Sequence, residues 1–258
     1  MNPLRVFFCF ARSGGTLLNR CLGCSEDNVV LSEVNPAGAF KPIIEQAEEW
    51  FGLITPDERE ALARLPYDEL VARLDERCVA QGRRLIVRDW TTVNFLPGTT
   101  QCGEPSGVLE QLVYLSERFS EVRGIVFTRK AAAVFDSVMS NIPTLSGLTE
   151  EAFAEAYLGY ARAVTGWPRF QLESFTCDPS GEFRRICDLL DAGFVKEFYE
   201  RQADFLRCTG DNTLVRRTGA EPKTGIRSVQ RTPGREIVST KARAKLREAD
   251  ALFGYEVG

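Results

Sequence analysis

The stretch LRVFFCFARSGGTLL, residues 4–18, decides the fold. Its opening part, Leu4–Phe10, is a short continuous apolar run of β-favouring residues, which is typical of a strand buried on both faces of a parallel sheet. The glycine-containing turn Arg12–Thr16 follows at once, and the next residues, LLNRCLG, have helical character. The segment therefore predicts a strand, a tight turn and a helix in succession.

The turn itself has the composition of an anion-binding loop. A glycine-rich turn at the N-terminus of a helix presents successive backbone N–H groups to an anion, and here Arg12, Ser13 and Thr16 add one charge and two hydroxyls. It matches neither the G-x-x-x-x-G-K-[ST] pattern of nucleotide hydrolases nor G-x-G-x-x-G. We therefore expect a phosphate-binding turn without the usual lysine, and an ordinary strand-to-helix turn is the alternative.

Strands and helices alternate along the rest of the chain. The sequence predicts strands at Asn28–Leu31, Arg84–Arg88, Gly124–Thr128 and Arg169–Phe175. It predicts helices within residues 41–81 and 107–119, and at Ala131–Ser140, Glu150–Val164, Phe183–Leu190 and Thr240–Leu252. This alternation favours a parallel α/β sheet covered by helices on both faces. With no linker and no repeat in 258 residues, we expect one domain, with a helical insertion at about residues 36–82.

The histidine count is zero, and that excludes several kinds of chemistry. Ser-His-Asp and Cys-His nucleophile pairs, HExxH zinc sites and any histidine general base all need an imidazole. Chemistry in this chain must therefore use carboxylates, Lys, Arg, Tyr, Ser, Thr, Cys or backbone amides.

Charge is unevenly distributed along the chain. The whole sequence has 32 Lys+Arg against 36 Asp+Glu, a net charge of −4, which gives no bias toward nucleic acid or an anionic membrane. Residues 207–247, however, contain eleven Lys or Arg and three Asp or Glu. Such a basic segment is either a solvated tail or a lid that closes over a multiply charged anion.

The cysteines and the N-terminus indicate where the protein works. Eight cysteines spread over this length do not form the dense framework of a small secreted domain, and they favour buried thiols in a reducing compartment. The pair Cys21 and Cys24 is a lone CxxC, for which helix packing is favoured over a redox role. The apolar run that ends at Arg12 is too short for a signal peptide or a membrane span, so we expect a cytoplasmic protein.

Three segments in order resemble the sulfotransferases that use 3′-phosphoadenylyl sulfate (PAPS). The turn and helix start at Arg12–Leu18 are similar to that family's 5′-phosphosulfate loop. Arg129 and Ser137, eight residues apart in FTRKAAAVFDSVMS, are similar to its Arg-x7-Ser pair for the 3′-phosphate. Residues 169–194, RFQLESFTCDPSGEFRRICDLLDAGF, are similar to the stretch before its C-terminal phosphate loop.

The resemblance implies a fold, a donor and a binding site. The fold would be the P-loop-like α/β sulfotransferase fold, the donor PAPS, the product adenosine 3′,5′-bisphosphate (PAP), and no metal would be required. The C-terminal loop departs from the family because it lacks an Arg-Lys-Gly triplet, so its residues are only substitutes by position. The implied donor-binding residues are Arg12, Ser13, Gly14, Gly15, Thr16, Leu17, Arg129, Ser137, Gly225, Arg227 and Ser228.

Transfer to a hydroxyl requires a base and cations that neutralise the charge on the transferring group. Glu33, in VVLSEVNP, resembles the glutamate base of the members that act on protein tyrosine and heparan glycans; the alternative is an ordinary loop carboxylate. Arg88, in IVRDW, resembles the strand-end cation near the scissile bond, and Arg12 adds a second charge. Asp89 is the reserve base, although an Asp at this position more often caps the following turn.

The acceptor is expected to be a hydroxyl on a small metabolite or a peptide, because the acidic body disfavours a polyanionic glycan. No nucleic-acid partner and no membrane span are expected, and a homodimer is left open. Two other functions are also left open: a magnesium-dependent small-molecule kinase, and an inactive relative that binds nucleotide or a partner protein. The aromatic residues that could line an acceptor pocket or pack in the core are Phe40, Trp50, Phe51, Trp90 and Phe95.

Overall fold

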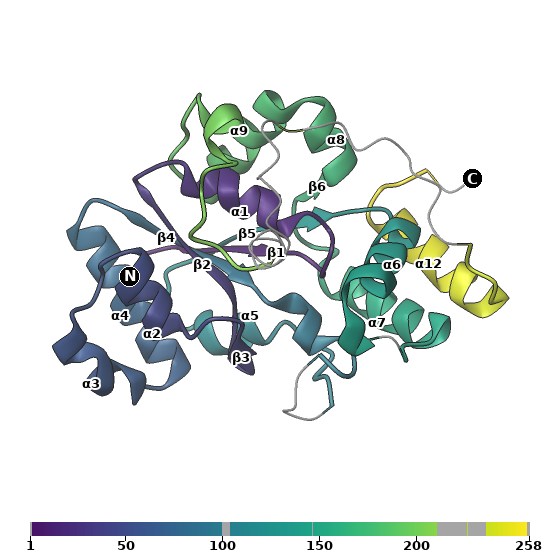
Figure 1. Cartoon of the computed structure of the whole chain (residues 1–258), viewed down its shortest axis with the longest axis horizontal. Helices are drawn as coiled ribbons and strands as arrows, with labels where there is room; N and C mark the ends of the chain where they lie inside the picture. The colour runs from purple at the N-terminus through teal and green to yellow at the C-terminus, as the bar shows by residue number, and fades with distance from the viewer. Residues whose placement is uncertain (1, 100–103, 146, 211–225, 227–235, 257–258) are drawn as a thin grey trace.

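A six-stranded sheet lies at the centre of the computed structural model, which describes residues 2–99, 104–145, 147–210, 226 and 236–256 (Figure 1). The strand order is β3-β2-β4-β1-β5-β6, and only the short β3 runs antiparallel to its neighbour. The strands are β1 (Leu4–Phe8), β2 (Asn28–Asn35), β3 (Gly38–Ala39), β4 (Arg84–Asp89), β5 (Val122–Thr128) and β6 (Arg169–Gln171). The predicted α/β sheet is confirmed.

Helices cover both faces of the sheet, because successive residues of each strand point to opposite sides. In β1, Val6 and Phe8 belong to one hydrophobic cluster, and Phe7 belongs to the other. Figure 1 shows α1, α8 and α9 on one side. That layer contains α1 (Gly15–Gly23), α8 (Leu172–Cys177), α9 (Pro179–Leu190) and α10 (Phe198–Arg201). The other layer contains α2 (Ile43–Glu45), α3 (Arg59–Ala63), α4 (Tyr67–Ala80), α5 (Glu110–Leu115), α6 (Ala131–Asn141), α7 (Glu150–Ala163) and α12 (Thr240–Leu252).

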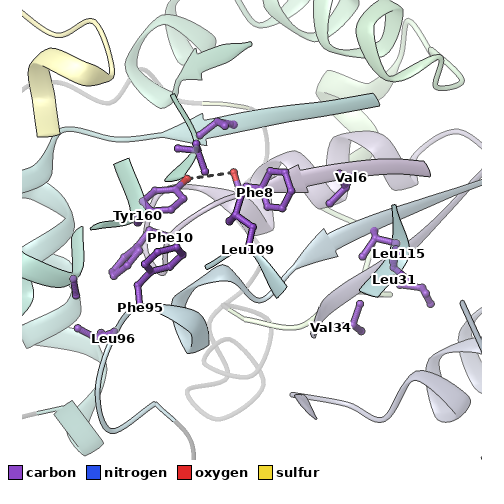
Figure 2. Packing of buried hydrophobic residues seen from close by; sticks show 14 of the residues in the cluster. Val6, Phe8, Phe10, Leu31, Val34, Phe95, Leu96, Leu109, Leu115 and Tyr160 are labelled. Carbon is purple, nitrogen blue, oxygen red and sulfur yellow. Dashed lines mark hydrogen bonds between the residues drawn. The ribbon is translucent and has the colours of Figure 1, made fainter. Parts of the chain in front are cut away.

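Aromatic packing fixes the end of β1, from which the turn begins. Phe10 is buried and meets Tyr157 edge to face, with ring centroids 5.2 Å apart. The hydroxyl of Tyr160 donates to the carbonyl of Phe8 at 3.5 Å, as the dashed line in Figure 2 shows. Because both tyrosines belong to α7, this helix anchors the strand end against the core.

The strand order places several loops at one edge of the sheet. The strands β2, β4, β1 and β5 are parallel, so their carboxyl ends meet at the same edge. The chain passes from β1 to β2 on one side of β1 and reaches β5 on the other, and ligands of open α/β sheets bind at such a switch point. The candidate residues Arg12, Glu33, Arg88 and Arg129 all lie at these strand ends.

One predicted strand is wrong in part. The strand expected over Arg169–Phe175 ends at Gln171, and Leu172–Cys177 forms the helix α8. Leu172 and Phe175 are both buried and lie three residues apart, which is a helical spacing. The alternation of apolar and polar residues in this stretch is too short to distinguish the two structures from sequence.

Residues 41–81 are helical as predicted, but in several short pieces. A π-helical turn, η1 (Gln46–Trp50), follows α2 directly, and a 3-10 turn, η2 (Pro56–Glu58), precedes α3. Thr55 caps η2 in a capping box with Glu58. The short strand β3 precedes these helices and pairs with the end of β2, so the insertion begins as part of the sheet.

The cysteines are mostly buried, as expected. Cys9, Cys21, Cys24, Cys78, Cys187 and Cys208 are buried, whereas Cys177 is exposed and Cys102 lies outside the described residues. In the CxxC pair, burial raises the pKa of Cys24 to about 11 and the pKa of Cys21 well above its usual value. Both thiols therefore stay protonated near neutral pH, which favours helix packing over redox chemistry. Within the described ranges, no helix is long and apolar enough to span a membrane.

Candidate active site

The turn after β1 is compressed against the sheet. Arg12 and Gly14 both have left-handed backbones, with φ of 68° and 92°. A Cβ on Gly15 would collide with the Cys9 sulfur and come within 3.1 Å of the Arg88 Nε atom. Gly14 caps α1 without a side-chain hydrogen bond, and the first N–H groups of a helix have no intrahelical acceptor. The turn therefore leaves backbone donors available to an anion.

Arg12, Arg129 and Ser137 meet beside this turn. The Arg12 Nε atom donates to the Ser137 hydroxyl at 2.9 Å, and the Arg129 Nη1 atom donates to the Arg12 carbonyl at 3.3 Å. Tyr157 holds the Arg129 backbone by donating to its carbonyl at 2.7 Å. The Arg129 Nε atom is buried with no hydrogen-bond partner among the described residues. Two guanidinium groups and a hydroxyl thus lie next to the helix N-terminus.

Glu33 and Arg88 form an ion pair at the ends of β2 and β4. The Arg88 Nη2 atom lies 2.8 Å from Glu33 Oε1, and the two side chains are 6% and 13% exposed. Arg88 also donates to the Ser32 hydroxyl at 3.4 Å. Burial lowers the pKa of Arg88, but the Glu33 carboxylate, together with Cys9 and Cys208, more than offsets this and the pKa is raised. Arg88 therefore carries a fixed positive charge directly beneath the turn.

Gln46 fixes the backbone that carries Glu33. Its side-chain oxygen accepts from the Ser32 N–H at 2.7 Å, and its side-chain nitrogen donates to the Ser32 carbonyl at 3.0 Å. Gln46 is fully buried at the start of η1, and a single π-helical turn inside a helix is often found at a functional site. The β2–β4 register shifts between Leu31 and Val34, and Glu33 has a left-handed backbone with φ of 50°. The Gln46 side chain thus makes the two hydrogen bonds to the Ser32 backbone that a neighbouring strand would otherwise make at this bulge.

Asp89 is built into the sheet edge in a different way. It is 1% exposed, and its two oxygens accept from Asn35 Nδ2 at 2.9 Å and from the Thr91 hydroxyl at 2.7 Å. Burial raises the pKa of Asp89 to about 7, and these two hydrogen bonds oppose the rise only in part. Thr91 starts the 3-10 turn η3 (Thr91–Asn94), whose N-cap is Trp90 without a side-chain hydrogen bond, so Asp89 contacts the Thr91 side chain but does not cap the turn as the sequence suggested.

The segment Cys208–Gly210 lies against the same residues. The Thr209 hydroxyl donates to Glu33 Oε2 in a short hydrogen bond, and the Thr209 N–H donates to the Ser32 hydroxyl at 3.1 Å. On the other side, the Thr16 hydroxyl donates to the Thr209 carbonyl at 3.4 Å. Thr209 therefore contacts both the turn after β1, through Thr16, and the candidate base Glu33.

The structure brings together most of the residues selected from sequence. Arg12, Arg129 and Ser137 are in contact, Glu33 pairs with Arg88, and the turn residues Ser13–Leu17 lie between these groups. Gly225, Arg227 and Ser228 lie outside the described residues.

Sequence reasoning missed Ser32, Gln46 and Thr209. Ser32 could have been suspected as the neighbour of Glu33. Gln46 and Thr209 belong to no motif, and they reach the site only through folding.

The aromatic residues divide between the core and the surface. Phe51 and Phe95 are 9% and 7% exposed and belong to the hydrophobic core, with Trp50 packed against it. Phe40 is 61% exposed and packs on Trp90, with ring centroids 4.4 Å apart. Beside Asn35 there is an open cavity of about 450 Å³. Its lining is Asn35, Pro36, Gly38, Ala39, Pro42, Ile43, Ile44, Glu45, Arg59, Ala63, Tyr67 and Leu70.

Comparison with solved structures gives full-length matches. The chain is similar to the sulfotransferase domain from the Synechococcus PCC 7002 olefin synthase, with a TM-score of 0.64 and 16% identity, over 100% of this chain and 97% of that one. It is also similar to the sulfotransferase domain from the curacin biosynthetic pathway, with a TM-score of 0.68 and 15% identity, over 99% of each chain. The fold is a sulfotransferase fold. The sequence itself matches no protein-family model and no curated protein.

The sulfotransferase fold confirms the predicted fold class: a single α/β domain with a mostly parallel sheet flanked by helices. The resemblance seen in the sequence motifs therefore extends to the whole chain at the level of the fold. At 15–16% identity, the likeness concerns the fold, and the roles of individual residues must be argued from the site itself.

Proposed function

We propose that the chain is a sulfotransferase that moves a sulfuryl group from PAPS to an acceptor hydroxyl. The observation that carries the proposal is the contact of the Arg12, Arg129 and Ser137 cluster with the anion-type turn, directly beside the Glu33–Arg88 pair. A donor with phosphates at both ends of its ribose requires two separate anion sites near one base. The turn and the Arg129–Ser137 pair, both at one edge of the sheet, support the proposal of two such sites.

The described residues fit such a donor. Gly14, Gly15 and Thr16 offer backbone N–H groups at a helix N-terminus, whereas those of Ser13 and Leu17 donate to the carbonyls of Phe10 and Gly14. At Gly14 and Gly15 an added Cβ would meet side chains already packed against the turn. The buried Arg129 Nε atom has no hydrogen-bond partner among the described residues, so its N–H group is available to a phosphate oxygen. We assign the 5′-phosphosulfate to the turn and the 3′-phosphate to Arg129 and Ser137. Gly225, Arg227 and Ser228 are proposed as further contacts by position.

PAPS supplies a sulfuryl group on a phosphate leaving group when it is bound. Glu33 is proposed to accept the proton of the acceptor hydroxyl at Oε2, because Oε1 is held by Arg88. Arg88 lies beneath Gly15 and, with Arg12, places positive charge where negative charge develops. Burial of Arg88 in a region of low dielectric strengthens this effect, since fewer water molecules screen the charge.

The acceptor is proposed to bind near the carboxyl end of β2. The cavity beside Asn35 is about 450 Å³ and is lined mainly by apolar side chains, with Glu45 and Arg59 among the polar ones. Pockets of this size accept small organic ligands. This supports a small metabolite or a short peptide side chain as the acceptor.

Calorimetry with PAP tests the donor site. We expect PAP to bind the wild type, and Arg129→Ala to weaken binding about tenfold or more, because a charge-assisted hydrogen bond contributes about 1.5–3 kcal/mol. Arg162→Ala is the matched control, because Arg162 is 59% exposed and pairs with Glu248 on the surface. Equal PAP affinity in the wild type and Arg129→Ala would contradict the assignment.

A thermal-shift comparison separates the two remaining functions. PAP should raise the melting temperature, whereas ATP with magnesium should not. Stabilisation by magnesium-ATP alone would favour a kinase instead. PAP binding without transfer to any hydroxyl acceptor would favour an inactive relative.

A further inference from the structure

The segment Cys208–Gly210 makes contacts that the proposed transfer does not require. It lies outside the sheet and far along the chain, yet three hydrogen bonds tie Thr209 to Ser32, Glu33 and Thr16. Cys208 is 4% exposed, so the segment is packed rather than loosely placed on the surface. The segment covers the part of the site between Glu33 and the turn Ser13–Leu17.

Thr209 presents its hydroxyl to Glu33 as a substrate would. A hydroxyl that donates to a carboxylate, with the carboxylate held by a third group, is the arrangement of a nucleophile, a base and an orienting residue. Here the hydroxyl belongs to Thr209, the base is Glu33, and Arg88 is the orienting group at 2.8 Å. The Ser32 hydroxyl lies 3.0 Å from the Thr209 hydroxyl and completes its hydrogen bonding.

The segment Cys208–Gly210 also contacts the turn Ser13–Leu17. The Thr16 hydroxyl donates to the Thr209 carbonyl at 3.4 Å, and a Cβ on Gly210 would collide with the Thr16 Oγ1 atom. Gly210 has φ of 93°, a backbone that other residues rarely adopt. The segment therefore fits closely between Thr16 and Glu33.

We propose that Thr209 is a pseudo-acceptor: its hydroxyl occupies the subsite on Glu33 Oε2 where the hydroxyl of the true acceptor binds. The inference rests on the proposed sulfotransferase function, since it gives Glu33 the role of base. An acceptor reaches Glu33 only after Cys208–Gly210 moves aside. The same movement releases the Thr16 hydroxyl for the donor.

The rate of Cys208 alkylation measures how often the segment opens. Thr209→Val keeps the side-chain shape and removes the hydroxyl, so alkylation of Cys208 by iodoacetamide, mapped by peptide mass spectrometry, should accelerate about tenfold or more. Thr209→Ser keeps the hydroxyl and should label close to the wild-type rate. Cys187 is buried in α9 and reports global unfolding, so its rate should not change.

A second variant opens the segment while leaving the Thr209 hydroxyl in place. Gly210→Ala places a methyl group against Thr16 and should accelerate Cys208 labelling as well. Gly82→Ala is the control, because Gly82 has a similar φ of 69° but no atom within 4 Å of its added Cβ. Wild-type labelling rates in both Thr209→Val and Gly210→Ala would overturn the proposal.

Calorimetry with PAP then tests whether the segment occupies the site. If it does, Thr209→Val binds PAP several-fold more tightly than the wild type, and Thr209→Ser does not. Faster labelling with unchanged PAP affinity would overturn the proposed release of Thr16 for the donor when the segment moves. Failure of every variant to bind PAP would instead reject the proposed sulfotransferase function, while the labelling rates still report on the Thr209 contact.

Discussion

The carboxyl ends of β2 and β4 carry one carboxylate each, and the two are held in opposite ways. Glu33 faces the Arg88 guanidinium group and the Thr209 hydroxyl, and its side chain is 13% exposed. Asp89 is 1% exposed and faces only neutral donors, Asn35 and Thr91. Adjacent strands of one sheet thus produce one carboxylate paired with a cation and one buried among neutral hydrogen-bond donors.

The comparison shows that a pKa near neutrality does not by itself mark the base. Burial raises the pKa of Asp89 to about 7, a value that suits a general base. Both Asp89 oxygens are nevertheless occupied by hydrogen bonds, one to the Thr91 hydroxyl and one to Asn35 that joins β2 to β4. Glu33 instead pairs with the Arg88 guanidinium group and directs Oε2 toward a hydroxyl, that of Thr209, so geometry favours it.

The largest expected effect is on transfer. Glu33→Gln should lower turnover by about 10²–10⁴-fold, because a general base contributes roughly that factor. Asp89→Asn should stay within a few-fold of the wild type. Transfer of a labelled sulfuryl group to an acceptor measures both variants, and PAP calorimetry shows that the donor site is intact. Near-normal turnover in Glu33→Gln, together with loss in Asp89→Asn, would reverse the assignment of the two carboxylates.

The second effect is on stability as a function of pH. The pKa of Asp89 is raised from 3.8 to about 7 by burial, so the folded state favours the protonated carboxyl. The stabilisation that Asp89 gives to the folded state is complete below the pKa of this carboxyl in the unfolded chain, and it is lost as the pH rises through about 7. At about 1.4 kcal/mol per pKa unit, the wild type should lose up to about 4 kcal/mol over this range. Asp89→Asn should remove this loss in urea unfolding measured at several pH values.

Asp250 provides the control for that experiment. Burial raises the pKa of Asp250 to about 6. Asp250 therefore also lowers the free energy of unfolding as the pH rises, but its effect ends near pH 6. Asp89→Asn should therefore leave the decline up to about pH 6 and flatten the profile above it. A profile unchanged from the wild type would mean that Asp89 is not buried as a protonated acid.

Much of this site could be predicted from the sequence because it follows strand ends. Arg12, Glu33, Arg88 and Arg129 each come directly after a run of buried β-favouring residues, and parallel strands bring such positions to one edge. The turn Ser13–Leu17 was predicted for the same reason, since its residues are contiguous and its chemistry depends on local backbone geometry. Local signals were sufficient for these residues.

The remaining residues depend on contacts between distant parts of the chain. Gln46 reaches Ser32 across the insertion, and Thr209 reaches Glu33 from a segment 176 residues further along. No local pattern marks either residue, since a buried Gln and a loop Thr are common elsewhere. The strand predicted over Arg169–Phe175 was wrong after Gln171 for a related reason: the buried positions that select a helix there depend on packing against α9 and β5.

The third expected effect concerns Gln46, which supports the Glu33 side of the comparison without touching Asp89. Gln46→Leu would leave the N–H and the carbonyl of Ser32 buried without partners, which costs about 1–3 kcal/mol for each unsatisfied group. Gln46→Glu keeps the oxygen that accepts from the Ser32 N–H but loses the donor to the carbonyl, so it should lose less. Urea unfolding measures both variants, and transfer should fall in the same order with PAP affinity unchanged. Equal stability and equal transfer in Gln46→Leu and the wild type would show that the left-handed backbone of Glu33 is maintained without Gln46.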